Sequence, residues 1–476
     1  MTKDTHGFAD PFESVDGNLK RAPDLVVYPN SDDAATAYTL PPAALAKHLK
    51  TFKTEQDIAS EKEKVARTVW HWATLLFEVK SNKYDSPFSD RPLSSNAPVP
   101  ESTAPTSPPL RDPPSVSQAL PSSVGDMFSP PPGPWTSGSG ALASDASMLA
   151  GLRVHLDRGR KTMGQLTEHA FKMMRRGSRL CVFSVFVCRE LAWLLRWDRA
   201  GVVVSEPFNL LEQPKKLHDF LYRFANMTDE QRGFDPTVAF ASKEEVELLR
   251  SPSKAGLDTP WQQAAFANTL PKGWPVYTIK IPETDFIPPS RLTPTSDEAQ
   301  NTPGPSSSKT RKLIVGMAYF ASNSITGRAT KCYLAYDVTD NRVLFCKEYW
   351  RVDLPTSHPE GDVYVKLHRN GVKYIPTPIA AGDVRSGADA LMYTRTQEFL
   401  PDKEPRSILY RFLLKEIGEP LERYRTSYQL VSALSLCIVG SSFSVYIYSG
   451  LLTDPNNSKP TNKHGRERAY YTETSA

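Results

Sequence analysis

Two long stretches rich in proline and serine interrupt this chain and limit which of its residues can fold. The first covers residues 84–149 and includes "SSNAPVPESTAPTSPPLRDPPSVSQALPSSVG"; the second covers residues 288–311, "PPSRLTPTSDEAQNTPGPSSSKTR". Such compositions cannot bury enough apolar surface to offset the entropy of ordering, so we expect both to be disordered. This leaves two folded parts, an N-terminal domain of residues 1–83 and 150–287, and a second domain of residues 312–435.

Net charge and cysteine content exclude few classes of function but give a first indication of the cellular compartment. The chain carries 57 basic and 53 acidic residues, for a net charge of +4. Bulk charge therefore gives no support for binding to nucleic acid or to a membrane surface. The five cysteines are scattered and mostly lie in apolar runs, which is typical of buried reduced thiols in an intracellular protein, cytoplasmic or nuclear. The N-terminus lacks the basic start and apolar stretch of a secretory signal.

One uncharged run near the C-terminus has the length of a membrane span. It covers residues 434–452, "LSLCIVGSSFSVYIYSGLL", and basic residues follow it. Its many serines and two tyrosines argue against insertion into lipid. We expect an exposed, aggregation-prone segment rather than a span.

The N-terminal half has the pattern of an α/β domain. Strand-like runs at 22–29 and 71–80 flank a charged helical stretch at 54–70. Apolar spacing predicts amphipathic helices, β-branched and aromatic runs predict strands, and "DRAG" predicts a hairpin turn. The segments concerned are a helix at 164–177, a strand at 179–190, a hairpin over 191–208 and a helix at 214–227.

A carboxylate and lysine pattern in this half resembles that of the restriction-endonuclease-like nucleases. Pro23-Asp24 precedes one strand, and "FEVK" places Glu78 and Lys80 on another. Two carboxylates on adjacent strands can hold a divalent metal such as magnesium, with the lysine beside the attacking water. Gln165 opens a helix, as a glutamine does in some of these nucleases. The alternative is that these side chains are simply exposed at strand ends.

The second domain begins with three strand-like runs, which predict an antiparallel meander. They cover 312–320, 329–338 and 342–350, and the third contains Lys347. Glu360 opens a helical segment thirteen residues later. In protein kinases a strand lysine binds the α- and β-phosphates of ATP and a helix glutamate orients it through an ion pair. The alternative is a surface lysine at a strand end and a glutamate that caps a helix.

The loop between the first two runs should cover the phosphates in such a site. Its sequence, "ASNSITGRAT", contains Gly327 as its single glycine and lacks the Gly-x-Gly-x-x-Gly pattern. Backbone amides could still approach a phosphate there.

The amino-acid sequence of several segments resembles that of the fungal-type protein kinase family, found mainly in mushroom-forming basidiomycetes. The resemblance is carried by "CKEYWRVD", "HPEGDVYVKLHRNGVKYIPTPIAAGDV", "LLRWDRAGVVVSEPF", "LHDFLYRFANMTDEQRGFDPTV" and "LLKEIGEPLERYRTSYQLVSAL". It covers most of residues 20–83 and 150–435. It implies a kinase small lobe, built of an antiparallel sheet and one helix, and ATP-dependent phosphorylation of hydroxyl groups on a protein substrate, with magnesium.

The resemblance also implies roles for single residues. Lys347 would be the ATP lysine, Glu360 its partner, and Gly327 part of the phosphate-covering loop. Backbone groups near Glu416 and Gly418 would form the hinge that faces adenine. Residues 428–434 would open the first helix of the large lobe. Four charged residues in the family-like motifs are expected to form structural ion pairs: Asp198, Arg199, Arg232 and Asp235.

The family pattern then stops. No His-Arg-Asp catalytic loop and no Asp-Phe-Gly metal site follow residue 435. We interpret residues 436–476 as a non-family tail of a truncated or mis-spliced product. The sequence therefore predicts a catalytically incomplete, pseudokinase-like protein that binds nucleotide weakly or interacts with an unknown protein partner. A metal-dependent nuclease or nucleic-acid-binding module in the N-terminal half is the alternative.

Overall fold

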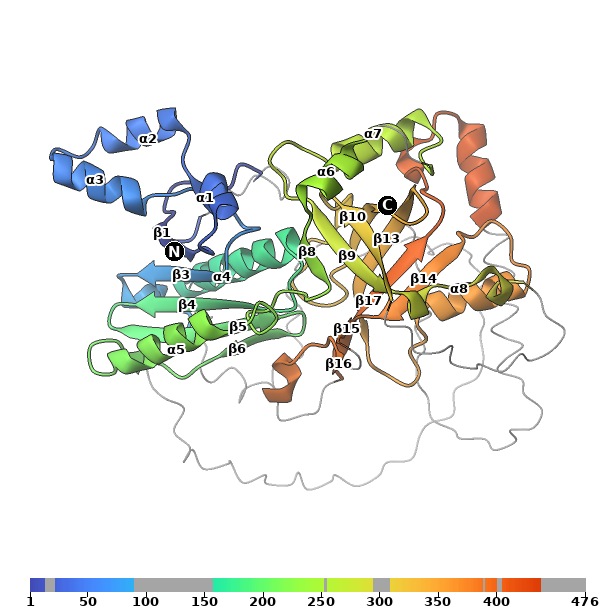
Figure 1. Ribbon diagram of the computed structural model, residues 1–476. Helices are drawn as coiled ribbons and strands as arrows, with labels where there is room; N and C mark the ends of the chain where they lie inside the picture. Colours follow the sequence, from blue (N-terminus) through green and yellow to red (C-terminus); the bar gives the residue numbers. More distant parts are fainter. Residues whose placement is uncertain are drawn as a thin grey trace, which may run out of the picture.

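The computed structural model describes two large β-sheets that lie side by side, each covered by helices (Figure 1), and a small two-stranded sheet of β15 (Arg385–Ser386) and β16 (Ala390–Leu391). It describes residues 1–12, 22–89, 157–251, 255–293, 309–387, 390–399 and 405–437. Most of the two Pro/Ser-rich stretches and of the segment 436–476 lie outside these ranges, so their predicted disorder and origin stay predictions.

The first sheet has seven strands in the order β1-β2-β3-β4-β5-β6, with β7 beside β5. β3 and β4 pair in parallel, and the remaining neighbours pair antiparallel. A parallel pair needs a crossover connection, which here includes α4 (Asp157–Arg176). The strands are β1 (Thr2–Asp4), β2 (Leu25–Val27), β3 (Leu75–Lys80), β4 (Val182–Cys188), β5 (Leu191–Asp198), β6 (Gly201–Val204) and β7 (Phe208–Asn209).

Helices cover both faces of the first sheet, because the central strands are apolar on both sides. On β4, Val182 and Phe186 belong to the core cluster beneath α4, whereas Val185 packs with Phe224 of α5 (Pro214–Asn226). This alternation is the period of two that a strand imposes on its side chains. The predicted helix at 214–227 is confirmed, and the one at 164–177 is confirmed with an earlier start. Gln165, which was expected to open this helix, therefore lies within α4. Three short helices between β2 and β3 lie at the outer end of the sheet (Figure 1): α1 (Asp32–Tyr38), α2 (Pro42–Leu49) and α3 (Glu55–Lys64).

The ordered part of the chain extends into both predicted linkers. Residues 84–89 were expected to be disordered, but Phe88 is buried in the first core. Its ring lies 5.7 Å from that of Phe186 and 5.6 Å from that of Trp193. A buried aromatic side chain supplies the apolar area that its Pro/Ser-rich neighbours lack. In the second linker, Thr310 and Arg311 already pair with β9.

The second sheet has eight strands in the order β14-β17-β13-β12-β10-β9-β8, with β11 beside β12. Its neighbours pair antiparallel, and α8 (Glu360–Arg369) packs beside β14. The predicted meander corresponds to β10, β12 and β13. The strands are β8 (Val238–Phe240), β9 (Tyr277–Pro282), β10 (Thr310–Val315), β11 (Phe320–Ala321), β12 (Lys331–Asp337), β13 (Arg342–Val352), β14 (Pro378–Asp383) and β17 (Ser407–Leu414).

The run at 312–320 was expected to form one strand, but the structure divides it into two, β10 and β11. It breaks after Val315, because the backbone of Gly316 closely approaches the end of α7 (Pro260–Asn268). A Cβ atom on Gly316 would lie 2.2 Å from the carbonyl oxygen of Thr269, and Met317 donates to the same carbonyl (2.7 Å).

Sheet membership changes earlier in the chain than the predicted domain boundary. β8 and β9 lie within residues 150–287, yet they extend the second sheet, and β9 pairs with β10 along the whole of β10. α6 (Lys243–Arg250) and α7 connect β8 to β9 and pack over this part of the sheet (Figure 1). The second folded unit therefore takes strands from both sides of the second linker.

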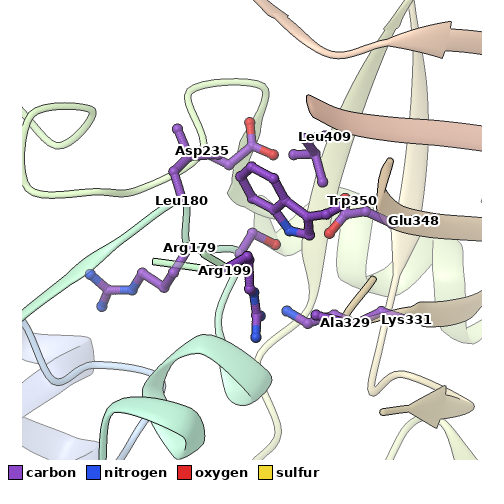
Figure 2. Close-up of a pocket in the computed structure, with 10 residues that line it drawn as sticks. Arg179, Leu180, Arg199, Asp235, Ala329, Lys331, Glu348, Trp350 and Leu409 are labelled. Atoms are coloured by element: carbon purple, nitrogen blue, oxygen red, sulfur yellow. The ribbon is translucent and has the colours of Figure 1, made fainter. Parts of the chain in front are cut away.

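The two sheets meet at a small polar cavity lined by charged side chains (Figure 2). Arg411 of β17 donates to Glu348 of β13 (2.9 Å) and to Asp235. Asp235 belongs to the segment that connects the first sheet to β8 of the second sheet. Lys331 of β12 donates to the carbonyl of Gly177 (2.8 Å), directly after α4. Burial lowers the pKa of Lys331 to about 7, although Glu348 raises it.

No helix in the described ranges is long and apolar enough to cross a membrane. The uncharged run at 434–452 lies largely outside these ranges.

Lys331 predicts a pH dependence of stability. Its pKa is about 7 when folded and 10.5 when exposed, so between these values the unfolded state binds more protons. The free energy of unfolding should therefore rise with pH in this window, by up to about 1.4 kcal/mol per pH unit. Replacing Lys331→Met should remove that rise. Urea unfolding of both proteins across this pH window measures the effect. If the difference in free energy of unfolding between wild type and Lys331→Met does not change with pH, Lys331 does not have the lowered pKa of a buried lysine.

Candidate nucleotide-binding site

Lys347 and Glu360 form an ion pair between β13 and α8. The ammonium of Lys347 donates to both carboxylate oxygens of Glu360, at 2.9 Å each. The side chains are 20% and 10% exposed, so the pair is partly accessible to solvent. The strand lysine and helix glutamate predicted from spacing are thus in contact, in the arrangement that can hold a lysine against nucleotide phosphates.

The position of Glu360 depends on the close approach of α8 to the sheet at Gly361. The Gly361 N–H donates to the hydroxyl of Tyr410 (3.0 Å). A Cβ atom on Gly361 would lie 2.2 Å from the Cβ of Ala381 and 2.7 Å from the Tyr410 hydroxyl. One turn later, the ring of Tyr364 packs edge-on against that of Phe412 (5.1 Å). Glycine therefore allows the first turn of α8 to reach the strands and hold Glu360 at Lys347.

Two neutral side chains lie beside the ion pair. Cys332 lies opposite Lys347 in the β12–β13 register, and burial raises the pKa of its thiol to about 11. Burial also raises the pKa of the Tyr349 phenol, and Glu360 raises it further. Both groups are neutral near pH 7.

Arg328 is a second cation at the site, which the sequence analysis did not identify. Its Nη2 lies 3.5 Å from Oε2 of Glu360, and its guanidinium stacks 4.4 Å from the ring centre of Tyr349. It directly follows Gly327, whose positive φ of 76° favours glycine. The site therefore has two cations and one carboxylate, a balance that suits an anionic ligand.

The predicted hinge follows β17 and is tied to its surroundings by side chains. The Glu416 carboxylate accepts from the backbone N–H (2.6 Å) and the hydroxyl (2.9 Å) of Thr377. The carbonyl of Ile417 accepts from Gln262 of α7 (2.9 Å). A Cβ atom on Gly418 would meet no atom within 4 Å, so the backbone is open on that side. The adenine-facing role of Glu416 and Gly418 stays a prediction.

Residues 427–437 are helical, as predicted for 428–434, whereas the role of this helix as the start of a large lobe stays a prediction. Tyr428 and Val431 on this helix are exposed.

The carboxylate and lysine pattern of the first sheet also comes together in space. Asp24 precedes β2 and accepts from the Val79 N–H of β3 (2.7 Å), between Glu78 and Lys80. The Lys80 ammonium donates to Glu78. Burial raises the pKa of Glu78, although the hydrogen bond from Lys80 lowers it.

His169 of α4 joins this cluster, although no pattern in the sequence indicated it. Its Nδ1 lies 3.6 Å from Oε2 of Glu78, a buried oxygen that accepts no hydrogen bond within the described residues. His6 contacts Oδ1 of Asp24 (3.2 Å), the carboxylate oxygen that does not bind the Val79 N–H. No group of three or more His, Cys, Asp or Glu side chains able to hold a metal ion occurs in the part of the chain that the structure describes.

Gly361 gives a matched pair of glycine substitutions. Gly361→Ala should destabilise the protein by about 1–3 kcal/mol, because its methyl group overlaps Ala381 and Tyr410. Gly164→Ala, in the middle of α4, meets no atom within 4 Å and should stabilise by up to about 1 kcal/mol. Chemical denaturation measures both. Equal effects at the two positions would show that α8 does not dock through Gly361.

Comparison with known protein families matches residues 151–446 to the fungal protein kinase family. The match includes Lys347, Glu360 and the junction between the two sheets, and it continues past residue 435, where we expected the family pattern to stop. Comparisons with curated proteins and with solved structures found no match. Since the family match spans more than half of the chain and contains the strand lysine and helix glutamate in contact, this chain belongs to the fungal protein kinase family.

Proposed function

We propose that the second sheet and α8 bind an adenine nucleotide, with its phosphates at Lys347. The observation that carries this proposal is the ion pair in which one ammonium contacts both oxygens of one carboxylate. A kinase family uses ATP with magnesium, and a lysine held in this way meets the α- and β-phosphates as a point charge.

Different residues would contribute different parts of nucleotide binding. Glu360 keeps the Lys347 ammonium in place before the ligand arrives, which lowers the entropic cost of ordering a long side chain. Arg328 supplies further positive charge beside the same carboxylate. The open backbone at Gly418 lies in the segment that would face adenine.

We infer that this chain binds nucleotide without transferring the phosphoryl group. The printed sequence contains no His-Arg-Asp and no Asp-Phe-Gly, the motifs that supply the base and a metal ligand in protein kinases. The proposed role is that of a pseudokinase-like module inside the cell, whose nucleotide-bound state is recognised by a protein partner.

Lys347→Met and Glu360→Gln test the nucleotide site. Lys347→Met removes a charge-assisted phosphate contact, worth about 1.5–3 kcal/mol, and should weaken ATP binding roughly ten- to hundredfold. Glu360→Gln removes the carboxylate that holds Lys347 in place and should weaken ATP binding as well. Adenosine has no phosphates, so its affinity should be the same in wild type and variants. Isothermal titration calorimetry with MgATP and with adenosine measures both constants.

Lys373→Met serves as the matched control, since Lys373 is an exposed lysine that follows α8 in the same unit. It should bind MgATP like the wild type. The proposal fails if wild-type protein does not bind MgATP, or if Lys347→Met binds it as tightly as Lys373→Met does.

A second candidate function is metal-dependent cleavage of nucleic acid by the first sheet. The observation that favours it is the contact of Asp24 with the backbone between Glu78 and Lys80, together with the buried Oε2 of Glu78. Magnesium takes one or two carboxylates and keeps several waters, so Asp24 and Glu78 would suffice as protein ligands, and Lys80 would face the attacking water.

Plasmid nicking in the presence of manganese tests this second function. Wild-type protein should convert supercoiled plasmid to the open form, whereas Asp24→Ala and Lys80→Ala should abolish conversion, because a ligand or the water-activating residue is lost. Chelation of the metal should stop the wild type as well. Nicking that survives both substitutions comes from another source and rules the candidate out.

A further inference from the structure

The turn between β11 and β12 lies against the first domain. Residues 322–330 form this turn, which is closed at its base by the Ser322 N–H donating to the carbonyl of Thr330 (2.8 Å). At its tip, Ile325 packs against the main core cluster of the first sheet. The segment that would cover nucleotide phosphates is thus attached to a different folded unit.

Arg199 makes hydrogen bonds in both directions with this turn. Its Nη1 donates to the carbonyl of Ile325 (3.1 Å), and its own carbonyl accepts from the Gly327 N–H (3.1 Å). Its Nη2 donates to the carbonyl of Met174 in α4 (3.3 Å). Arg199 is only 4% exposed, so water competes little for these hydrogen bonds. One buried side chain therefore joins α4 to the turn.

Neighbouring residues strengthen this attachment. Arg175 of α4 donates to the side-chain oxygen of Asn323. Asp198, next to Arg199, accepts from the backbone N–H groups of Arg395 (2.8 Å) and Thr396 (2.9 Å) of the second unit. Asp198 and Arg199, which the sequence analysis expected to form structural ion pairs, thus also bind backbone groups of the second unit.

The other end of the turn reaches the ion pair. Arg328 directly follows Gly327, its guanidinium lies beside Glu360, and its carbonyl accepts from the Trp350 N–H of β13 (2.8 Å). A continuous set of contacts therefore runs from Arg199 through the turn to Glu360 and Lys347.

We propose that Arg199 is a positioning residue for nucleotide phosphates. By fixing residues 322–330 on the first domain, it holds the backbone of the turn and Arg328 where a phosphate bound at Lys347 would meet them. A turn that is already ordered loses less conformational entropy when a ligand binds. This inference rests on the proposed nucleotide binding, but the attachment of the turn can be measured without a nucleotide.

Arg199→Met is the test, with Arg232→Met as the matched control. Arg232 also donates to two backbone carbonyls of the first domain, those of Phe224 (3.1 Å) and Ala225 (2.7 Å), and its ion pair with Asp229 likewise lies away from the turn. Two measurements are made on the full chain. Hydrogen exchange reports the protection of residues 320–330 without ligand, and calorimetry reports the affinities for MgATP and adenosine.

Arg199→Met should increase the exchange of the turn and weaken MgATP binding by about tenfold, while adenosine binding changes less than about twofold. Arg232→Met should leave the turn and the ratio of the two affinities unchanged. If Arg199→Met does not fold, Ile325→Ala, which loosens the same turn from its own side, should give the same selective loss.

The outcomes separate this inference from the proposed function. If wild-type protein binds no MgATP, the proposed function fails, and the exchange measurement alone decides whether Arg199 holds the turn. If MgATP binds through Lys347 but Arg199→Met and Ile325→Ala match Arg232→Met in both measurements, the positioning role is wrong.

Discussion

Arg411 is a cation with almost no access to water, and the junction of the two sheets depends on it. A buried guanidinium is tolerated only where carboxylates and hydrogen-bond acceptors surround it, and here Glu348 comes from the same sheet and Asp235 from the segment before β8. Removing one partner would leave the other charges buried and uncompensated, which costs far more than a surface ion pair does. This junction fixes the first domain relative to β13, the strand that carries Lys347. The geometry of the nucleotide site therefore depends on a contact that lies outside the site.

At the site itself, packing decides where the charges lie. The Lys347–Glu360 ion pair is partly exposed, and ion pairs of this kind contribute little to stability. The approach of Gly361 to Ala381 and Tyr410 places the helix, and the ion pair follows from that placement. Arg328 then makes the site net positive, and the turn that carries it is attached to the first domain. The function we propose therefore needs both units, although the residues that would touch the nucleotide belong to one.

The sequence predicted the features that have a short-range signal. Apolar periodicity predicted α4 and α5, and the spacing of Lys347 and Glu360 predicted a pair that the structure brings into contact. Features set by distant partners could not be predicted. β8 is three residues long, too short to show an alternation of apolar and polar residues. Phe88 lies near the N-terminal end of a Pro/Ser-rich stretch, whose overall composition predicts disorder. Arg199 binds backbone carbonyls, which leave no trace in the identity of any residue. The hinge role of Glu416 and Gly418 depends on a ligand, so neither the sequence nor the fold decides it.

The pairing of β9 with β10 has a consequence for dividing the protein into fragments. The stretch 288–311 looks like a natural place to cut, but a fragment that starts there loses β8 and β9. It would expose the full length of β10 as an open edge, with its N–H and C=O groups facing solvent. Such edges pair with other chains, so the excised lobe would self-associate through β10. A fragment that begins before Val238 keeps the edge covered, whereas the visible linker divides a sheet rather than two independent folds.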